Sequence, residues 1–161
     1  MNKILTVDQA IKEGEKIRRE KKSIVLAGGC FDILHIGHIT FLEKAKASGD
    51  SLFVFLEPDE SIKKIKGGGR PINNQENRAK ILAALEPVDY VILLPPHLTD
   101  IDYDRMIIQL KPAIIATTRG DIHKKNKERQ AALIKSKVIE VADYIRDQST
   151  SRLVKLLGNE L

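Results

Sequence analysis

The chain has 161 residues, 42% hydrophobic and 30% charged, so it can bury an ordinary core and is not disordered. This length predicts one domain, and the composition excludes a membrane-spanning protein, because no apolar run approaches the ~20 residues of a span. Lysine and arginine exceed aspartate and glutamate by 27 to 22, a net charge of +5 that suits anionic partners.

The predicted elements begin with an amphipathic helix that ends near Lys21, because apolar residues recur at helical spacing from Val7 to Ile17. We therefore divide the chain into an N-terminal amphipathic helix, residues 1–22, and a domain of residues 23–161. Short apolar runs predict buried strands at Ser23–Ala27, Ser51–Leu56, Val88–Leu94, Ala113–Thr117 and Val138–Val141. Predicted helices are Gly37–Ala47, Asp59–Lys66 (a short basic helix or turn), Gln75–Leu85, Tyr103–Leu110, Lys124–Ser136 and Ser149–Leu157.

This alternation of strands and helices predicts an α/β fold, a single doubly wound, Rossmann-like domain with a five-stranded parallel sheet. The segment Gly28–Ala47, which follows the first predicted strand, carries the chemistry. A glycine pair leads there into a helix, and in such sheets ligands bind beyond the carboxyl ends of the strands. Helix N-termini at that edge present free N–H groups to phosphate.

His35 and His38 stand three residues apart at the start of this helix, which places both imidazoles on one side of the turn. Two imidazoles aimed at one point could stabilise charge that builds on an α-phosphate during attack. The alternatives are a structural role or a zinc site, and a zinc site would need a third ligand. Spacing alone leaves these alternatives open.

The segment CFDILHIGH, from Cys30 to His38, resembles the (T/C)-F-D-x-L-H-x-G-H signature of the cytidylyltransferase-like nucleotidyltransferases. The resemblance covers Ser23 to Leu157, and Arg70 to Val91 looks most like heptose-1-phosphate adenylyltransferase. It implies that the chain transfers a nucleoside monophosphate, here adenylyl, from an NTP to a phosphorylated acceptor such as heptose 1-phosphate, releasing pyrophosphate. Glycerol-3-phosphate cytidylyltransferase or FAD synthase-like activity is the alternative, and a non-catalytic nucleotide sensor is the alternative outside the enzymes.

The resemblance also implies roles for particular residues. His35, His38 and Lys66 would be catalytic, and Lys63, Lys64 and Arg119 are candidates for acceptor binding. The implied nucleotide-binding residues are Gly29, Cys30, Phe31, Asp32, Gly37, Arg78, Gly120, Asp121, Ser149, Thr150 and Ser151.

Three of these groups keep a second interpretation. The lysines near the triple glycine Gly67–Gly69 form a basic loop that either closes over phosphates or is simply solvated. The hydroxyls of Ser149–Ser151 either hold the nucleotide or cap a helix. The stretch Ala116–His123 departs from the K-G-G-D-Y-like element of the heptose-phosphate enzymes, with Thr118 at the lysine position. Arg119 either replaces that lysine as a phosphate clamp or lies on the surface.

We expect Mg2+ to accompany the NTP with no metal site of the protein's own, since phosphate charge density generally requires the ion. Nucleic acid is not an expected partner, because aromatic residues make up only 4% of the chain and tryptophan is absent. We expect a homodimer from the family resemblance. The lone Cys30 and the absence of an apolar leader favour the cytoplasm.

Overall fold

The computed structural model describes residues 2–143 and 152–155, and residues 149–151 of the predicted hydroxyl triplet lie outside this part. Its strands are β1 (Ile4–Leu5), β2 (Ile24–Gly29), β3 (Ser51–Leu56), β4 (Tyr90–Leu93), β5 (Ile114–Thr118) and β6 (Lys137–Ala142). Its helices are α1 (Val7–Arg19), α2 (Ile36–Lys46), α3 (Asp59–Lys66), α4 (Gln75–Ala83), α5 (Asp100–Leu110) and α6 (Lys124–Leu133). Residues 152–155 are also helical.

The six strands form one parallel sheet in the order β1-β4-β3-β2-β5-β6. The α/β, Rossmann-like prediction is confirmed, but the prediction of five strands is wrong. The additional strand is β1, whose Ile4 and Leu5 pair with Val91 and Ile92. Two residues are too few to show a strand period, so only the pairing with β4 reveals this strand.

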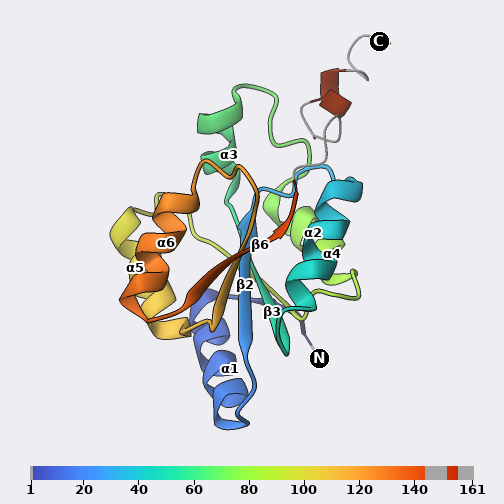
Figure 1. The fold of residues 1–161 in the computed structure, drawn as a ribbon. Coiled ribbons are helices and arrows are strands. Elements are labelled where there is room, and N and C mark those ends of the chain that lie inside the picture. The colour runs from blue at the N-terminus through green and yellow to red at the C-terminus, as the bar shows by residue number, and fades with distance from the viewer. Residues whose placement is uncertain (1, 144–151, 156–161) are drawn as a thin grey trace.

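Helices cover both faces of the sheet (Figure 1), as expected for a doubly wound fold. One core layer lies under α2 and α4 and includes Leu42, Ala79 and Leu82. The other lies under α1, α5 and α6 and includes Ile17, Leu110 and Ala131. The N-terminal segment therefore shares the sheet and core of the rest of the described chain.

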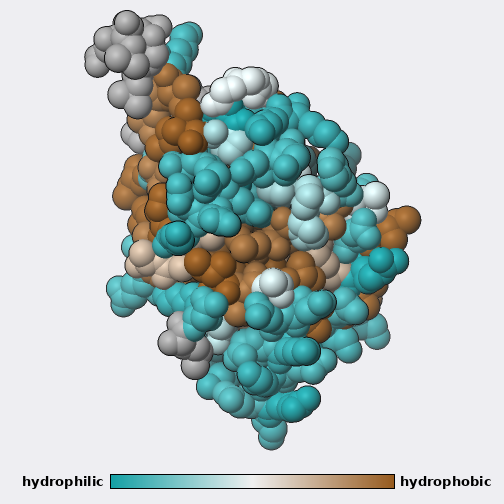
Figure 2. All heavy atoms as spheres, turned by 180° about the vertical axis from the view of Figure 1, so that it is seen from behind, coloured by the Kyte–Doolittle hydropathy of each residue, from teal (hydrophilic) through white to brown (hydrophobic). Residues whose placement is uncertain are grey.

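The carboxyl ends of all strands meet at the upper edge of the sheet in Figure 1, and α3 stands above this edge. The loop after β2 begins there, and α2 starts beside it. Seen from behind, hydrophobic residues form a band between hydrophilic ones (Figure 2). Across residues 2–143 and 152–155, the structure contains no helix of the length and apolarity that a membrane crossing requires.

Candidate active site

The two histidines lie against each other at the N-terminus of α2. His35 is the residue before the helix, in extended backbone with φ −143°, and His38 lies in the first turn. Their rings stack with centroids 3.8 Å apart, and Phe31 packs on His38 at 5.2 Å. In each ring Nδ1 is buried without a hydrogen-bond partner among the described residues, which leaves Nε2 as the nitrogen that a ligand can reach.

Both histidines are held neutral by their surroundings. Burial lowers the pKa of His38 to about 4, and the charges of His35 and Lys66 add to this effect. Burial and the charge of Lys66 also lower the pKa of His35. At neutral pH each imidazole therefore has one N–H to donate and carries no charge of its own.

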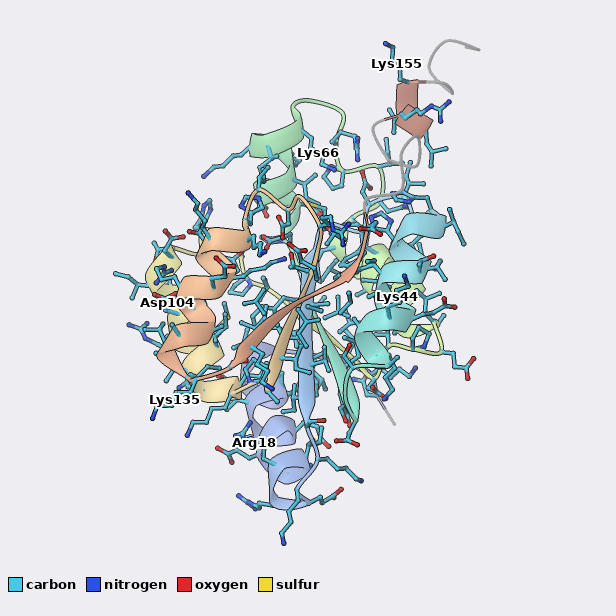
Figure 3. The ribbon with its side chains drawn as sticks, viewed as in Figure 1. Arg18, Lys44, Lys66, Asp104, Lys135 and Lys155 are labelled. Atoms are coloured by element: carbon cyan, nitrogen blue, oxygen red, sulfur yellow. The ribbon has the colours of Figure 1, made fainter. Side chains whose placement is uncertain are left out.

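Lys66 ends α3 and lies above the carboxyl edge of the sheet (Figure 3). Its positive charge acts to lower the pKa values of His35, His38 and the Cys30 thiol. One lysine therefore acts electrostatically on all three side chains around the N-terminus of α2. Lys63 lies one turn earlier on the same side of the helix. Lys64 lines a cavity of about 200 Å³ with His97 and Leu98, and neither His35 nor His38 is among the residues that line it.

The loop after β2 supports the histidines through its backbone and its aromatic ring. A Cβ on Gly29 would approach the Phe31 ring to 3.0 Å, so glycine leaves room for the ring that packs on His38. Phe31 itself has φ 44°, in the left-handed region. Burial raises the pKa of the Cys30 thiol, which therefore stays protonated. Gly37 lies between the two histidines, within the first turn of α2.

Asp32 fastens this loop to the segment before α4. Its carboxylate accepts hydrogen bonds from Arg70 Nε at 2.7 Å and from the N–H groups of Ile72 and Asn73 at 2.8 and 3.0 Å. Burial alone would raise the pKa of Asp32, but these hydrogen bonds outweigh it and lower the pKa. Asp32 as a whole is only 2% exposed, and this geometry is that of a residue that holds the loop in place.

Arg78 joins the loops that surround the site. It is fully buried, and its guanidinium donates to the carbonyls of Asn73, Cys30 and Glu57 and to Asp59 at 2.6–2.9 Å. These bonds tie the ends of β2 and β3 to α3 and α4. The sequence pattern indicated a nucleotide contact at this arginine, whereas its geometry is that of a connecting residue.

The carboxyl end of β5 carries a second network. Asp121 accepts hydrogen bonds from Thr117 Oγ1 and Lys127 Nζ, both at 2.6 Å, and from the N–H of His123 at 2.8 Å. Burial opposes ionisation of Asp121, but the bonds from Lys127 and Thr117 hold its pKa at about 2. Gly120 supplies the turn before it, with φ 80°.

Arg119 points away from this network. It lies 3.2 Å from Asp143 and 3.9 Å from Glu140, and its side chain is 74% exposed. The lysine that reaches Asp121 is instead Lys127 of α6, which sequence reasoning missed because it lies ten residues beyond Thr117. The sequence does not indicate which acidic residue a lysine of a basic helix contacts, because that contact depends on how α6 packs beside β5.

Glu57 and Tyr103 were also missed. Glu57 directly follows β3 and accepts hydrogen bonds from the Tyr103 hydroxyl at 2.8 and 2.9 Å. An acidic residue immediately after a buried strand was the available signal. No group of three or more histidine, cysteine, aspartate or glutamate side chains that could hold a metal ion occurs within residues 2–143 and 152–155.

These features define the class of protein, a nucleotide-binding α/β domain with an H-x-G-H loop at the switch point of its sheet. The cytidylyltransferase-like family model matches residues 26–154, and the chain belongs to that family. This membership supports the prediction of a nucleotidyltransferase.

Curated relatives and solved structures resemble this chain in sequence and in fold. The chain is 39% identical over 152 residues to the bifunctional protein HldE of Aliarcobacter butzleri (strain RM4018), covering 94% of this chain and 30% of the relative. It is 34% identical to that of Pseudomonas fluorescens (strain SBW25), covering 97% and 32%. The chain thus spans about a third of the length of these relatives.

A lipopolysaccharide core biosynthesis protein from Thermoplasma volcanium GSS1 superposes with a TM-score of 0.63 at 28% identity, covering 79% of this chain and 99% of that one. A pantoate-beta-alanine ligase from Francisella tularensis has a TM-score of 0.62 at 17% identity, covering 89% of this chain and 68% of that one, and shows the fold alone.

Proposed function

We propose that this chain transfers the adenylyl group of ATP to a sugar phosphate of the heptose type and releases pyrophosphate. The observation that carries the proposal is the stacked pair of neutral histidines at the head of α2, with Lys66 acting on both. The likeness of Arg70–Val91 to heptose-1-phosphate adenylyltransferase favours the heptose type and ATP. The HldE relatives are consistent with this choice.

In the proposed reaction a phosphate oxygen of the acceptor attacks the α-phosphorus of ATP. A new P–O bond forms there, the bond to the β-phosphate oxygen breaks, and pyrophosphate leaves. His35 and His38 donate hydrogen bonds to oxygens of the α-phosphate as charge builds on them. Lys66 neutralises charge on the leaving group or on the acceptor, and no side-chain nucleophile is needed.

Mg2+ fits this arrangement as an ion carried by the nucleotide. When bound, it would supply neutralisation of the phosphate charge. Among the described residues, Asp32 is engaged by Arg70 and backbone N–H groups and Asp121 by Lys127, whereas Glu57 accepts only from the Tyr103 hydroxyl. No group of three or more side chains that could hold a metal ion occurs among these residues, so the phosphates and water would be its principal ligands.

The test is pyrophosphate release with ATP and CTP against a panel of heptose and hexose 1-phosphates, glycerol 3-phosphate and FMN. We expect release with ATP and a sugar 1-phosphate. Release only with CTP and glycerol 3-phosphate, or only with FMN, would replace the proposal by one of the alternative activities. Nucleotide binding without release from any pair would establish a sensor.

A homodimer and a cytoplasmic site of action belong to the same proposal. The hydrophobic band seen from behind in Figure 2 offers a surface for a second copy. Light scattering at micromolar concentration should give twice the 18.0 kDa of one chain, and a monomer mass would refute the dimer. The cytoplasm supplies ATP and keeps a lone thiol such as Cys30 reduced.

A further inference from the structure

Glu57 lies beside the catalytic loop, and both its backbone N–H and its backbone carbonyl form hydrogen bonds. Its N–H donates to the carbonyl of Gly29 at 3.2 Å, and its own carbonyl accepts from Arg78 Nη2 at 2.9 Å. Gly29 and Leu56 are paired across β2 and β3, so Glu57 is the neighbour of Cys30 at the carboxyl edge. The position of this carboxylate is therefore set by the sheet.

The Glu57 carboxylate has unused capacity to accept hydrogen bonds. Tyr103 supplies one O–H proton, shared between the two carboxylate oxygens, whereas a carboxylate offers about four lone-pair positions. Within the described part of the chain no lysine, arginine or histidine nitrogen forms an ion pair with it. Burial raises its pKa, and the Tyr103 hydrogen bond and the charges of His123 and Arg78 only partly offset this.

Asp121 is a carboxylate at the same edge of the sheet that does form an ion pair. Asp121 lies on the β5 side of the catalytic loop and is paired with Lys127, whereas Glu57 lies on the β3 side and forms no ion pair within the described part of the chain. A half-buried carboxylate without a cation lowers the stability of the fold, and such groups are typical of functional sites. Glu57, beside the loop that carries the histidines, therefore keeps capacity to bind a ligand.

We propose that Glu57, held by Tyr103, binds hydroxyl groups of the acceptor, and that it selects a polyhydroxylated phosphate such as a sugar phosphate. The inference rests on the proposed transferase function and adds the residue that recognises the acceptor. Hydroxyl groups donate readily to a carboxylate, whereas a phosphate would be repelled by it. The acceptor is thereby oriented, with its phosphate toward Lys66 and the histidines and its hydroxyls toward Glu57.

A cavity of about 200 Å³ lies next to α3, which begins two residues after Glu57, and is also lined by His97 and Leu98 from the loop before α5. Its polar lining residues are Glu60, Ser61, Lys64 and His97, and Glu57 is not one of its lining residues. A sugar that extends beyond Glu57 toward α3 would meet these polar groups.

Steady-state kinetics of Glu57→Gln tests the inference, with a sugar 1-phosphate and its deoxy analogues as acceptors. We expect the acceptor KM to rise at least tenfold while the ATP KM stays within twofold, because a hydrogen bond to a charged group is worth roughly a factor of ten or more. Tyr103→Phe, which keeps the ring, should show the same pattern more weakly. Glu86→Gln, an exposed glutamate before β4, is the matched control and should change neither KM.

The deoxy analogues identify the contact. For at least one hydroxyl, its removal should cost the wild-type enzyme about tenfold and cost Glu57→Gln much less. Equal losses in both proteins for every analogue would overturn the proposal, as would parallel changes in the ATP and acceptor KM values.

Binding separates this inference from the proposed transferase activity. If the wild-type protein releases no pyrophosphate with any acceptor, calorimetric binding of the sugar 1-phosphate, with a non-hydrolysable ATP analogue present, replaces the kinetics. Weaker binding to Glu57→Gln than to wild type would then support the hydroxyl site although the transferase proposal had failed. Equal binding, or none to either protein, would refute the hydroxyl site.

Discussion

His35 and His38 owe their chemistry to a local arrangement that keeps both imidazoles uncharged. Burial and the nearby charge of Lys66 make a proton on either ring unfavourable. A neutral ring donates one hydrogen bond and gains interaction energy as negative charge grows on a phosphate. This difference between ground state and transition state is what catalysis requires.

His35→Ala and His38→Ala should each lower kcat about a hundredfold and change ATP binding much less. The loss of one such donor costs roughly 3 kcal/mol of transition-state stabilisation. Single-turnover rates and nucleotide titrations measure the two quantities separately. Lys44→Ala, on α2 below the carboxyl edge (Figure 3), is the control for a change in the same helix. Equal losses in binding and turnover would mean that the pair only holds the bound nucleotide.

The lowered pKa of His38 also predicts a pH dependence of stability. Below about pH 6.5 the unfolded chain takes up a proton that the folded chain resists until about pH 4. The free energy of unfolding should therefore fall as the pH drops through this window, by up to about 3 kcal/mol from His38. Urea unfolding of wild type and His38→Gln at pH 7 and pH 4.5 measures it. The same pH sensitivity in both proteins would contradict the prediction.

The loops joined by Arg78, together with α3, form the carboxyl edge of the sheet at which the candidate site lies. Arg78 and Asp32 hold the loop after β2 against the segments before α3 and α4. The N-terminus of α2 and α3 thereby lie at the same carboxyl edge of the sheet (Figure 1). A rigid frame of this kind keeps reacting groups in place without spending substrate binding energy on ordering them.

Lys66→Ala should lower kcat and raise the apparent KM for substrate, because it removes a positive charge that acts on both histidines. Lys63→Ala and Lys64→Ala should have smaller effects, with Lys64 altering only the acceptor KM. Lys44→Ala is the control, since Lys44 lies on α2 below the carboxyl edge (Figure 3). A larger loss from Lys63→Ala than from Lys66→Ala would show that the wrong lysine was chosen.

At the scale of the whole molecule, the parallel sheet decides how the N-terminal segment is used. β1 pairs with β4, and α1 buries Ala10 and Ile17 in the same core as Leu110 of α5. Arg18 also donates to the carbonyl of Leu110. We therefore propose that residues 1–22, taken as a separate unit from the sequence, fold together with residues 23–161.

Deletion of residues 1–22 should prevent stable folding, because it uncovers one core layer along Ile24 and Leu110. Ile17→Ala is the milder variant and should lower the free energy of unfolding by about 2–3 kcal/mol, since Ile17 is 7% exposed. Chemical denaturation followed by circular dichroism measures both. An unchanged unfolding transition in the truncated chain would show instead that the segment is an independent unit.

The sequence predicted the parts that local pattern controls. Apolar runs such as Ser51–Leu56 and the helical spacing of α1 follow from periods of a few residues, and the helices and strands of the described chain follow them. Sequence patterns did not predict the short strand β1, and the prediction for the hydroxyl triplet Ser149–Ser151 stays a prediction. β1 is too short to carry a pattern, and the triplet lies outside the described residues.

The H-x-G-H loop after an apolar strand was determined by the sequence alone, because its residues are neighbours along the chain. Only the tertiary structure decided which distant side chains complete the site. It buried Arg78, turned Arg119 toward Asp143, brought Lys127 to Asp121 and set Glu57 beside Cys30 with the Tyr103 hydroxyl as its hydrogen-bond donor. The physical reason is that these contacts join separate strands and helices, and their distances depend on how the elements pack across the sheet.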